Sequence, residues 1–196
     1  QEMNGRNSFH EAALGGNIKI VDLIRSAGGN PLSRDTYGDS PFSLVLNYDE
    51  NVLRAVLGTN RNIVDSDGNT PIHIAVEKKV SAQKLDTLIK MGYPVSQRNG
   101  KGVTPLNMAI TNGQKSLALT LIERGADPFA ATITGDNALT NAFKNGNVEI
   151  LDAKNQEKEK KDLRLEPTIV SNSTTPTFLD SLGYYHNISE EMLYDK

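Results

Sequence analysis

The chain has 196 residues, enough for one domain or a domain with an appendage, and it contains no cysteine, which excludes disulfides, thiolate zinc sites and cysteine nucleophiles. Its formal net charge is −3, from 21 basic and 24 acidic residues, and no long basic run is interleaved with aromatic residues as a nucleic-acid groove would need. No apolar run approaches the roughly 18 residues of a membrane helix, so we expect neither nucleic acid nor a membrane as the partner.

Five short stretches, taken in chain order, begin alike and define a repeat. They read "NSFHEAAL", "DSPFSLVL", "NTPIHIAV", "VTPLNMAI" and "DNALTNAF", and their shared slot holds Asn7, Ser40, Thr70, Thr104 and Asn137. The steps between these positions are 33, 30, 34 and 33 residues. Self-similarity with a period of this size is typical of solenoids and other repeat folds.

A second landmark has the same period. Four glycines are each followed ten residues later by another: Gly28 by Gly38, Gly58 by Gly68, Gly92 by Gly102 and Gly125 by Gly135. Apolar residues at helical spacing lead into the first glycine of each pair, over residues 18–29, 50–58, 81–92 and 114–125. Glycine tolerates the left-handed position that ends a helix, and the glycine-to-glycine segments are polar and turn-rich. Each repeat is therefore predicted to contain two short helices and a hairpin-like loop.

These motifs resemble those of an ankyrin-repeat protein. "DSDGNTPIHIAV", "GKGVTPLNMAITNG" and "LALTLIERGADP" are similar to the family's unit, and "FHEAALGGN" with "SAGGNP" resembles a degenerate first unit. The resemblance covers about residues 7 to 153, as four full units and the start of a fifth. It implies an all-α fold, an ankyrin-repeat α-solenoid. The second unit is three residues short and carries "NYDEN" where the turn between its helices is expected, so its local geometry stays open.

The histidine in "DGNTPIHIAV" has two possible roles. As a ligand or base, His73 would need partners, but no neighbouring unit supplies a histidine in the matching slot. The resemblance implies instead that Thr70 caps the first helix, Pro71 occupies its first turn and His73 joins a local hydrogen-bond set. We therefore interpret His73 as structural.

A calcium loop is the other site that this stretch suggests. Asp65, Asp67 and Asn69 match the opening of such a loop, but Thr70 stands where glycine is required. The resemblance accounts for the same residues as a hairpin. We assign no metal site, no cofactor and no catalytic residue, and we expect a protein that is not an enzyme.

A solenoid leaves a long concave surface, and the resemblance implies that the hairpin tips and the ends of the first helices project from it. Interface hot spots favour Tyr, Trp and Arg, and the chain has no Trp, so Tyr37 and Tyr48 are the natural anchors. Tyr48 has a second interpretation, as packing that fills the irregular second unit. The mixed signs of the nearby charges favour a polar peptide or protein partner. The predicted partner-binding set is Arg34, Thr36, Tyr37, Tyr48, Asp67, Glu77, Lys78, Arg98, Lys101, Thr111 and Asn112.

The repeat pattern is predicted to end at Ala153, because a run of charged residues begins at Lys154 where apolar residues are due. Two interpretations stay open: a natural polar cap that ends in a charged helix through about Arg164, or a sequence that is not natively continuous at this junction. We expect a repeat domain over 1–153, a charged and then Ser/Thr/Pro-rich linker over 154–176, and an amphipathic C-terminal segment over 177–196.

The C-terminal segment is dense in apolar groups, which favours one or two short helices. It could cover the open last repeat, which we prefer, occupy the concave groove, or bind a neighbouring chain. The sequence as a whole favours a non-catalytic module that binds a protein or peptide on its concave face. The alternative is the substrate-recognition part of a larger enzyme or effector.

Overall fold

The computed structural model describes residues 5–133, 135–144, 177–179 and 185–187. The chain forms two compact units, residues 1–156 and 157–196, which are described separately. The helices of the first unit are α1 (Ser8–Leu14), α2 (Ile18–Ser26), α3 (Pro41–Leu44), α4 (Glu50–Leu57), α5 (Pro71–Glu77), α6 (Ala82–Lys90), α7 (Pro105–Thr111), α8 (Lys115–Glu123) and α9 (Ala138–Lys144).

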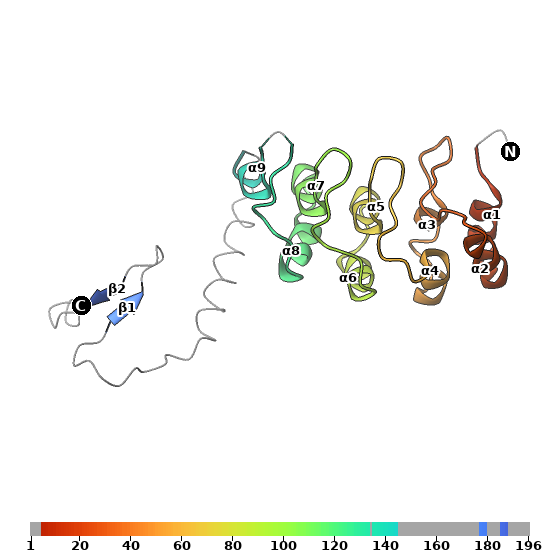
Figure 1. Cartoon of the computed structure of the whole chain (residues 1–196), viewed down its shortest axis with the longest axis horizontal. Coiled ribbons are helices and arrows are strands. Elements are labelled where there is room, and N and C mark those ends of the chain that lie inside the picture. Colours follow the sequence, from red (N-terminus) through yellow and green to blue (C-terminus); the bar gives the residue numbers. More distant parts are fainter. Residues whose placement is uncertain (1–4, 134, 145–176, 180–184, 188–196) are drawn as a thin grey trace. The chain divides into compact units, whose positions relative to one another are not determined.

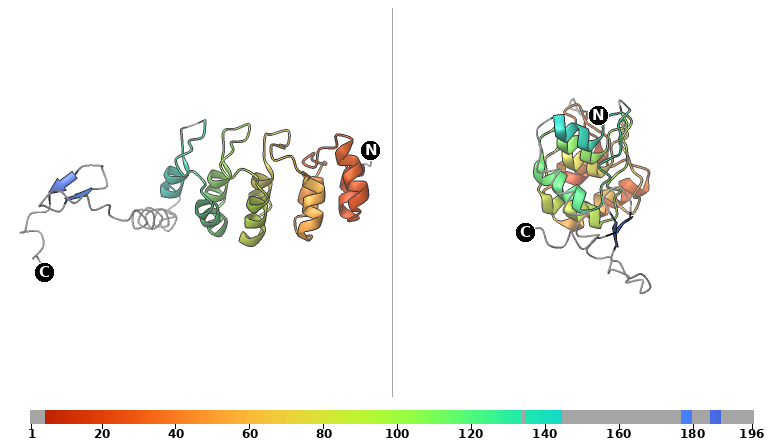
Figure 2. Two further views of the ribbon diagram at one scale, coloured as in Figure 1. Left: turned by 60° about the horizontal axis from the view of Figure 1, so that its bottom comes forward. Right: turned by 90° about the vertical axis from the view of Figure 1, so that its left-hand side faces the viewer.

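These helices form two rows. The first helix of each repeat lies in one row, α1, α3, α5, α7 and α9, and the second helices α2, α4, α6 and α8 lie in the other (Figure 1). Hairpin loops project from the row of first helices, all to the same side, and the repeats superimpose when seen along the stack (Figure 2). Neighbouring repeats contact each other within each row, α1 with α3 and α2 with α4 for example. The predicted α-solenoid is confirmed.

The first helices begin where the shared slot predicted. Side-chain oxygens of Asn7, Ser40, Thr70 and Thr104 each accept a backbone N–H from the third residue of the following helix. In α3, α5 and α7 a proline follows the cap directly, where its missing N–H leaves no helical bond unmade. Local sequence alone thus fixes the start of each first helix.

The hairpins turn at equivalent glycines. In each hairpin the glycine N–H donates to the carbonyl three residues earlier: Gly38 to Asp35, Gly68 to Asp65, Gly102 to Asn99 and Gly135 to Thr132. Their φ angles lie between 70° and 83°, the left-handed region that glycine occupies without steric cost. The glycine period seen in the sequence is therefore one corner repeated along one edge.

One apolar core runs through all the repeats. The second residue after each cap is buried, and it packs with the inward stripes of the second helices, such as Leu53 and Leu85; these residues are Phe9, Phe42, Ile72 and Leu106. Each repeat is too small to bury its apolar stripe alone, so stacking supplies the core.

The second repeat departs from the others in its first helix. Helix α3 has four residues where α1, α5 and α7 have seven, although Val45 and Leu46, just after it, remain buried. Tyr48 lies in the shortened turn that follows. Its hydroxyl donates to the carbonyl oxygen of Leu14 at 3.1 Å, and its own carbonyl accepts from Nζ of Lys84 at 2.8 Å. The side chain thus bridges the first repeat to the shortened turn.

The second unit contains two short strands, β1 (Thr177–Leu179) and β2 (Tyr185–Asn187), which pair antiparallel with Phe178 opposite His186. The expectation of helix is wrong for these residues. Aromatic residues in both segments favour strands, and a five-residue connection that contains glycine is typical of a hairpin. Over the described ranges, no helix is both long and apolar enough to cross a membrane.

Candidate functional site

The row of hairpin tips is built by one side chain at the base of each hairpin. One Asp35 carboxylate oxygen accepts the backbone N–H groups of Tyr37 and Asp39, both at 2.9 Å. Asp65 and Asn99 accept the corresponding pairs in the next two hairpins, at 2.8 to 3.0 Å. The same short-range bonds therefore hold the second tip residues, Tyr37, Asp67 and Lys101, in equivalent positions.

Consecutive hairpins also contact each other through backbone. The Gly100 N–H donates to the carbonyl of Asp67 at 2.8 Å, which joins the hairpin of the third repeat to that of the fourth. A methyl group built on Gly68 would lie only 2.6 Å from the Gly100 nitrogen, so the two loops stack too closely for any side chain there. The tips thus form a continuous edge.

Two of the predicted residues, Arg34 and Glu77, are joined across this edge. The Arg34 guanidinium donates to both Glu77 carboxylate oxygens, at 2.9 and 2.7 Å, and its Nε donates to Asp65 at 3.0 Å. The hydrogen bonds from Arg34 lower the pKa of Glu77 and outweigh its partial burial, while the bond to Glu77 raises the pKa of Arg34. A bidentate pair of this kind is geometrically specific as well as charged.

The predicted Lys78 is also paired within the chain. Its Nζ lies 2.6 Å from the Asp39 carboxylate, in the hairpin of the preceding repeat. Lys78 directly follows α5, so this pair and the Arg34–Glu77 pair both tie the end of that helix to the second repeat. The mixed charges predicted here neutralise one another across repeats.

The remaining predicted residues differ in how they are engaged. Tyr37, at the tip of its hairpin, is 74% exposed. Tyr48 instead makes the bridge to Leu14 described above, and Thr36 lies against Gly5. Within the described part of the chain, several exposed side chains have neither a hydrogen bond nor an ion pair: Tyr37, Asp67, Arg98, Lys101, Thr111 and Asn112. The edge therefore has ion pairs between repeats around Arg34 and, among the described residues, no ion pair at Arg98 or Lys101 further along the stack.

Two exposed apolar residues were not among the predicted set. Ile133 is 80% exposed and Phe129 is 58% exposed, both in the loop between α8 and α9. Ile133 stands at the tip of its hairpin, directly after Thr132 in the turn that the Gly135 N–H closes. The repeat register predicts that this position lies at a hairpin tip. The criterion for binding residues, the preference of hot spots for Tyr, Trp and Arg, does not select an isoleucine.

His73 takes part in the local hydrogen-bond set that was predicted for it. Its ring is fully buried; Nδ1 accepts the Thr70 backbone N–H at 3.2 Å, and Nε2 lies 2.9 Å from the carbonyl oxygen of Val103 in the next repeat. Burial lowers the pKa of His73 and outweighs the bond to Val103. Within the described residues, no three His, Asp or Glu side chains gather as a metal site would need.

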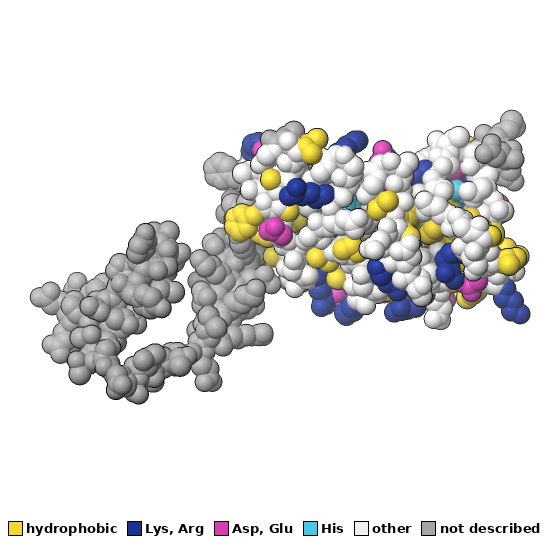
Figure 3. Space-filling model, in the orientation of Figure 1, with side chains coloured by type: hydrophobic (Ala, Val, Ile, Leu, Met, Phe, Trp, Pro, Cys, Tyr) yellow, Lys and Arg dark blue, Asp and Glu magenta, His cyan; other side chains and the backbone are white. Residues whose placement is uncertain are grey.

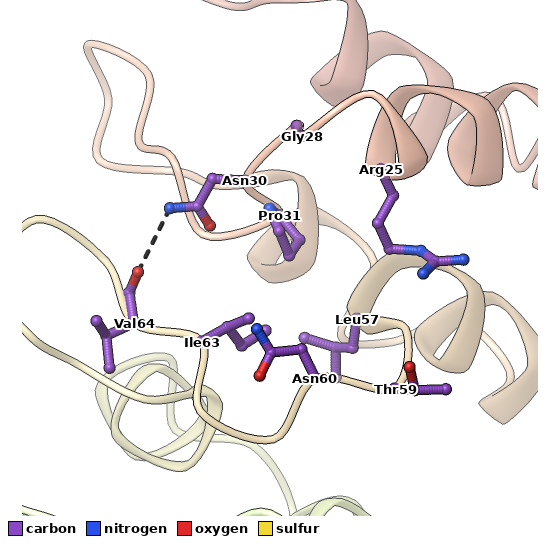
Figure 4. A pocket seen from close by; sticks show the side chains of 10 residues that line it. Arg25, Gly28, Asn30, Pro31, Leu57, Thr59, Asn60, Ile63 and Val64 are labelled. Atoms are coloured by element: carbon purple, nitrogen blue, oxygen red, sulfur yellow. Dashed lines mark hydrogen bonds between the residues drawn. The ribbon is translucent and has the colours of Figure 1, made fainter.

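A pocket of about 420 Å³ lies between the first two repeats, away from the hairpin tips (Figure 4). Its walls come from the loops that follow α2 and α4, and Asn30 crosses it to donate to the Val64 carbonyl at 3.4 Å. Arg25 is the one ionisable residue of its lining, and none of the predicted site residues lies there.

Comparison with known proteins identifies the repeats. The family described as ankyrin repeats, in three copies, matches residues 42–132. The chain is 32% identical to the E3 ubiquitin-protein ligase KEG of Arabidopsis thaliana over 109 residues, and 32% identical to the palmitoyltransferase AKR1 of Lachancea kluyveri over 136 residues. It is 30% identical to the B-cell lymphoma 3 protein homolog of Mus musculus over 159 residues. These matches cover 52%, 66% and 76% of this chain but 7%, 18% and 36% of the relatives' lengths.

Proposed function

Because this chain is an ankyrin-repeat protein, we propose that it is a non-catalytic module that binds another protein or a peptide along its hairpin edge. Ankyrin repeats are in general protein–protein interaction modules. The concave side of a solenoid offers an extended surface whose elements are held rigidly by stacking. The backbone of the tips is held by part-buried hydrogen bonds to Asp35, Asp65 and Asn99, so binding has to order little of it.

The single observation that carries the proposal is the exposure of Tyr37 at a hairpin tip. This residue is a large amphipathic side chain, 74% exposed and without an internal partner, on a tip whose backbone is locked by Asp35. Tyrosine is enriched among the residues that dominate binding energy. We propose Tyr37 as the anchor, with Asp67, Lys101, Thr111 and Asn112 as surrounding polar contacts.

Pull-down from the native source, with quantitative mass spectrometry, tests this proposal. Tyr37→Ala is expected to lower recovery of the partner by roughly tenfold, the effect of losing about 1.4 kcal/mol of binding energy. The matched control is Leu23→Ala, because Leu23 is 71% exposed on α2, outside the hairpin edge. Unchanged recovery with Tyr37→Ala, or equal losses with both variants at unchanged thermal stability, would refute the anchor.

A second candidate is that the repeats recognise substrates for an enzyme of which they are one part. The observation that favours it is that two of the relatives are named as a ligase and a palmitoyltransferase, of which the matching segments make up 7% and 18%. A full reading frame that encodes a catalytic domain in continuity with these repeats would support it. The hairpin edge would then bind the substrate protein.

A further inference from the structure

Two arginines occupy the same position in different repeats, and only one of them is paired within the described part of the chain. Arg34 and Arg98 each stand one residue before the base of a hairpin, Asp35 and Asn99. The Arg34 guanidinium binds two carboxylates, from Asp65 at the base of the next hairpin and Glu77 at the end of the next first helix. The chain itself thus shows what an arginine in this slot binds.

The fourth repeat keeps the arginine, as Arg98, but the fifth repeat lacks a carboxylate at both positions that correspond to Asp65 and Glu77. Arg98 precedes the hairpin of Asn99, and Thr132 stands at the base of the next hairpin along the stack, where Asp65 stands in relation to Arg34. Lys144 comes 12 residues after Thr132, as Glu77 comes 12 residues after Asp65, so a cation replaces the acid. Lys144 is paired with Asp136 at 2.7 Å. Among the described residues, Arg98 has no carboxylate partner.

An exposed aliphatic side chain packs against the hairpin that begins just after this arginine. Ile133 packs over the hairpin that follows Arg98: a methyl group built on Gly102 would lie 2.7 Å from Ile133 Cγ2. Lys101, exposed and unpaired, is next to that glycine in the same hairpin. Over the end of the repeats that carries α7 and α9, Figure 3 shows Lys and Arg side chains in dark blue close to hydrophobic ones in yellow. Two cations that are unpaired within the described ranges, Arg98 and Lys101, therefore lie in or directly before the hairpin against which Ile133 packs.

We propose that this surface, made of Arg98, Lys101 and Ile133, binds an acidic peptide segment that also carries an apolar side chain. A carboxylate of the peptide takes on Arg98 the place that Glu77 takes on Arg34, because the planar guanidinium matches a carboxylate with two parallel hydrogen bonds. The apolar side chain covers Ile133, which would otherwise stay in water. This inference rests on the proposed function and specifies the chemistry of the partner at one end of the edge.

Short synthetic peptides of equal length test it against the full chain by fluorescence anisotropy. One peptide combines Glu with Leu, one combines Glu with Gly, and one combines Lys with Leu. The Glu/Leu peptide is expected to bind most tightly, and its affinity falls as salt rises, because the contacts are exposed. Arg98→Glu should weaken Glu/Leu binding by about tenfold and strengthen binding of Lys/Leu, since the charge is reversed. Ile133→Ser should weaken Glu/Leu several-fold and leave Glu/Gly unchanged.

Lys19→Glu is the matched control, because it makes the same kind of charge change at an exposed position of α2, outside the hairpin edge. It is expected to leave all three affinities and the melting temperature unchanged. The inference is overturned by absence of peptide binding, by equal affinity for Glu/Leu and Lys/Leu, by equal effects of Arg98→Glu and Lys19→Glu, or by tighter binding of a single-stranded oligonucleotide. None of these outcomes decides the proposed function, which is tested separately by the Tyr37→Ala pull-down.

Discussion

At the scale of single residues, the third position of the first helix links three of the repeats to the loop that follows. His10, His73 and Asn107 occupy equivalent positions in α1, α5 and α7, and each places a ring or amide nitrogen 2.9 to 3.1 Å from a carbonyl oxygen of the following loop. His73 also accepts the Thr70 N–H through Nδ1, which requires the neutral tautomer with its proton on Nε2. The cap of one helix and the anchoring of the next hairpin therefore depend on the same ring.

Protonation of His73 should destabilise the protein. The folded-state pKa lies below the unfolded value of about 6.5, because burial disfavours the charged ring and because a proton on Nδ1 would face the Thr70 N–H. Stability is thus complete above about pH 6.5 and is lost as the pH falls toward the lowered pKa, by at most about 1.4 kcal/mol per pH unit.

Urea unfolding at about pH 7.5 and about pH 5.5 checks this, because the two values lie on either side of the unfolded pKa. His73→Asn, which places the residue of the Asn107 slot at this position, should reduce the loss between the two pH values. The carboxylates with lowered pKa, Asp35, Asp65 and Glu77, lose their contribution at lower pH, below their ordinary values. Equal losses in the wild type and the variant would show that His73 is not the titrating group.

At the scale of the elements, the hairpin glycines differ in how much space surrounds them, so the hairpins differ in whether a side chain can be added at that position. Gly38 and Gly68 turn equivalent hairpins with φ of 78° and 77°. A methyl group on Gly68 would lie 2.6 Å from the Gly100 nitrogen, whereas on Gly38 the one near atom, Arg34 Nη1, would be 3.9 Å away. Comparing substitutions at these two glycines therefore separates two losses of stability: the backbone strain of a left-handed residue, and the clash with the neighbouring hairpin.

Gly38→Ala is expected to lower the free energy of unfolding by about 1 kcal/mol, from backbone strain alone. Gly68→Ala carries the same strain plus a clash with the backbone, so it should cost about 2 kcal/mol more, within the range of overpacking. Denaturant midpoints at constant m-value measure both. If the two variants lost the same stability, the hairpins of the third and fourth repeats would not be stacked as the structure shows.

The sequence predicted those features of the elements that depend on nearby residues. The caps at Ser40 and Thr70 and the glycine corners follow from local chemistry repeated at one period, and the structure confirms them. The short α3 did not follow, because its end depends on how Tyr48 packs against the first repeat. The strands at 177–179 and 185–187 were also missed, because three residues hold too little pattern to distinguish strand from helix.

The same limit explains the predicted site. The sequence predicts Arg34 and Glu77 as separate surface contacts, yet they bind each other across 43 residues of sequence. Such a pair depends on how neighbouring repeats are stacked. The sequence period predicts that the repeats stack, but it does not predict which side chains come within hydrogen-bond distance. Repeat register did place Tyr37 and Ile133 at tips, and their exposure follows from that position.

At the scale of the molecule, the repeats form a quasi-one-dimensional stack in which each unit contacts its neighbours. The charges of the hairpin edge are paired with one another around Arg34, whereas Arg98 and Lys101 carry positive charge that no described residue pairs. A partner that follows this edge would meet an aromatic anchor at Tyr37 and a carboxylate-binding surface two hairpins further on. Everything proposed about function requires that the hairpins stand in register along one edge.

Disulfide trapping tests that register most directly, because the chain has no cysteine of its own. A Cβ atom on Gly102 would lie 3.6 Å from Ile133 Cβ, within the roughly 3.5–4.5 Å that a disulfide spans. The full chain with Gly102→Cys and Ile133→Cys is therefore predicted to form an intramolecular disulfide on mild oxidation. The control pair, Gly38→Cys with Ile133→Cys, joins hairpins of distant repeats and should stay reduced or cross-link only between molecules. Closure of the control pair, or failure of the adjacent pair to close, would contradict the stacked edge on which the account depends.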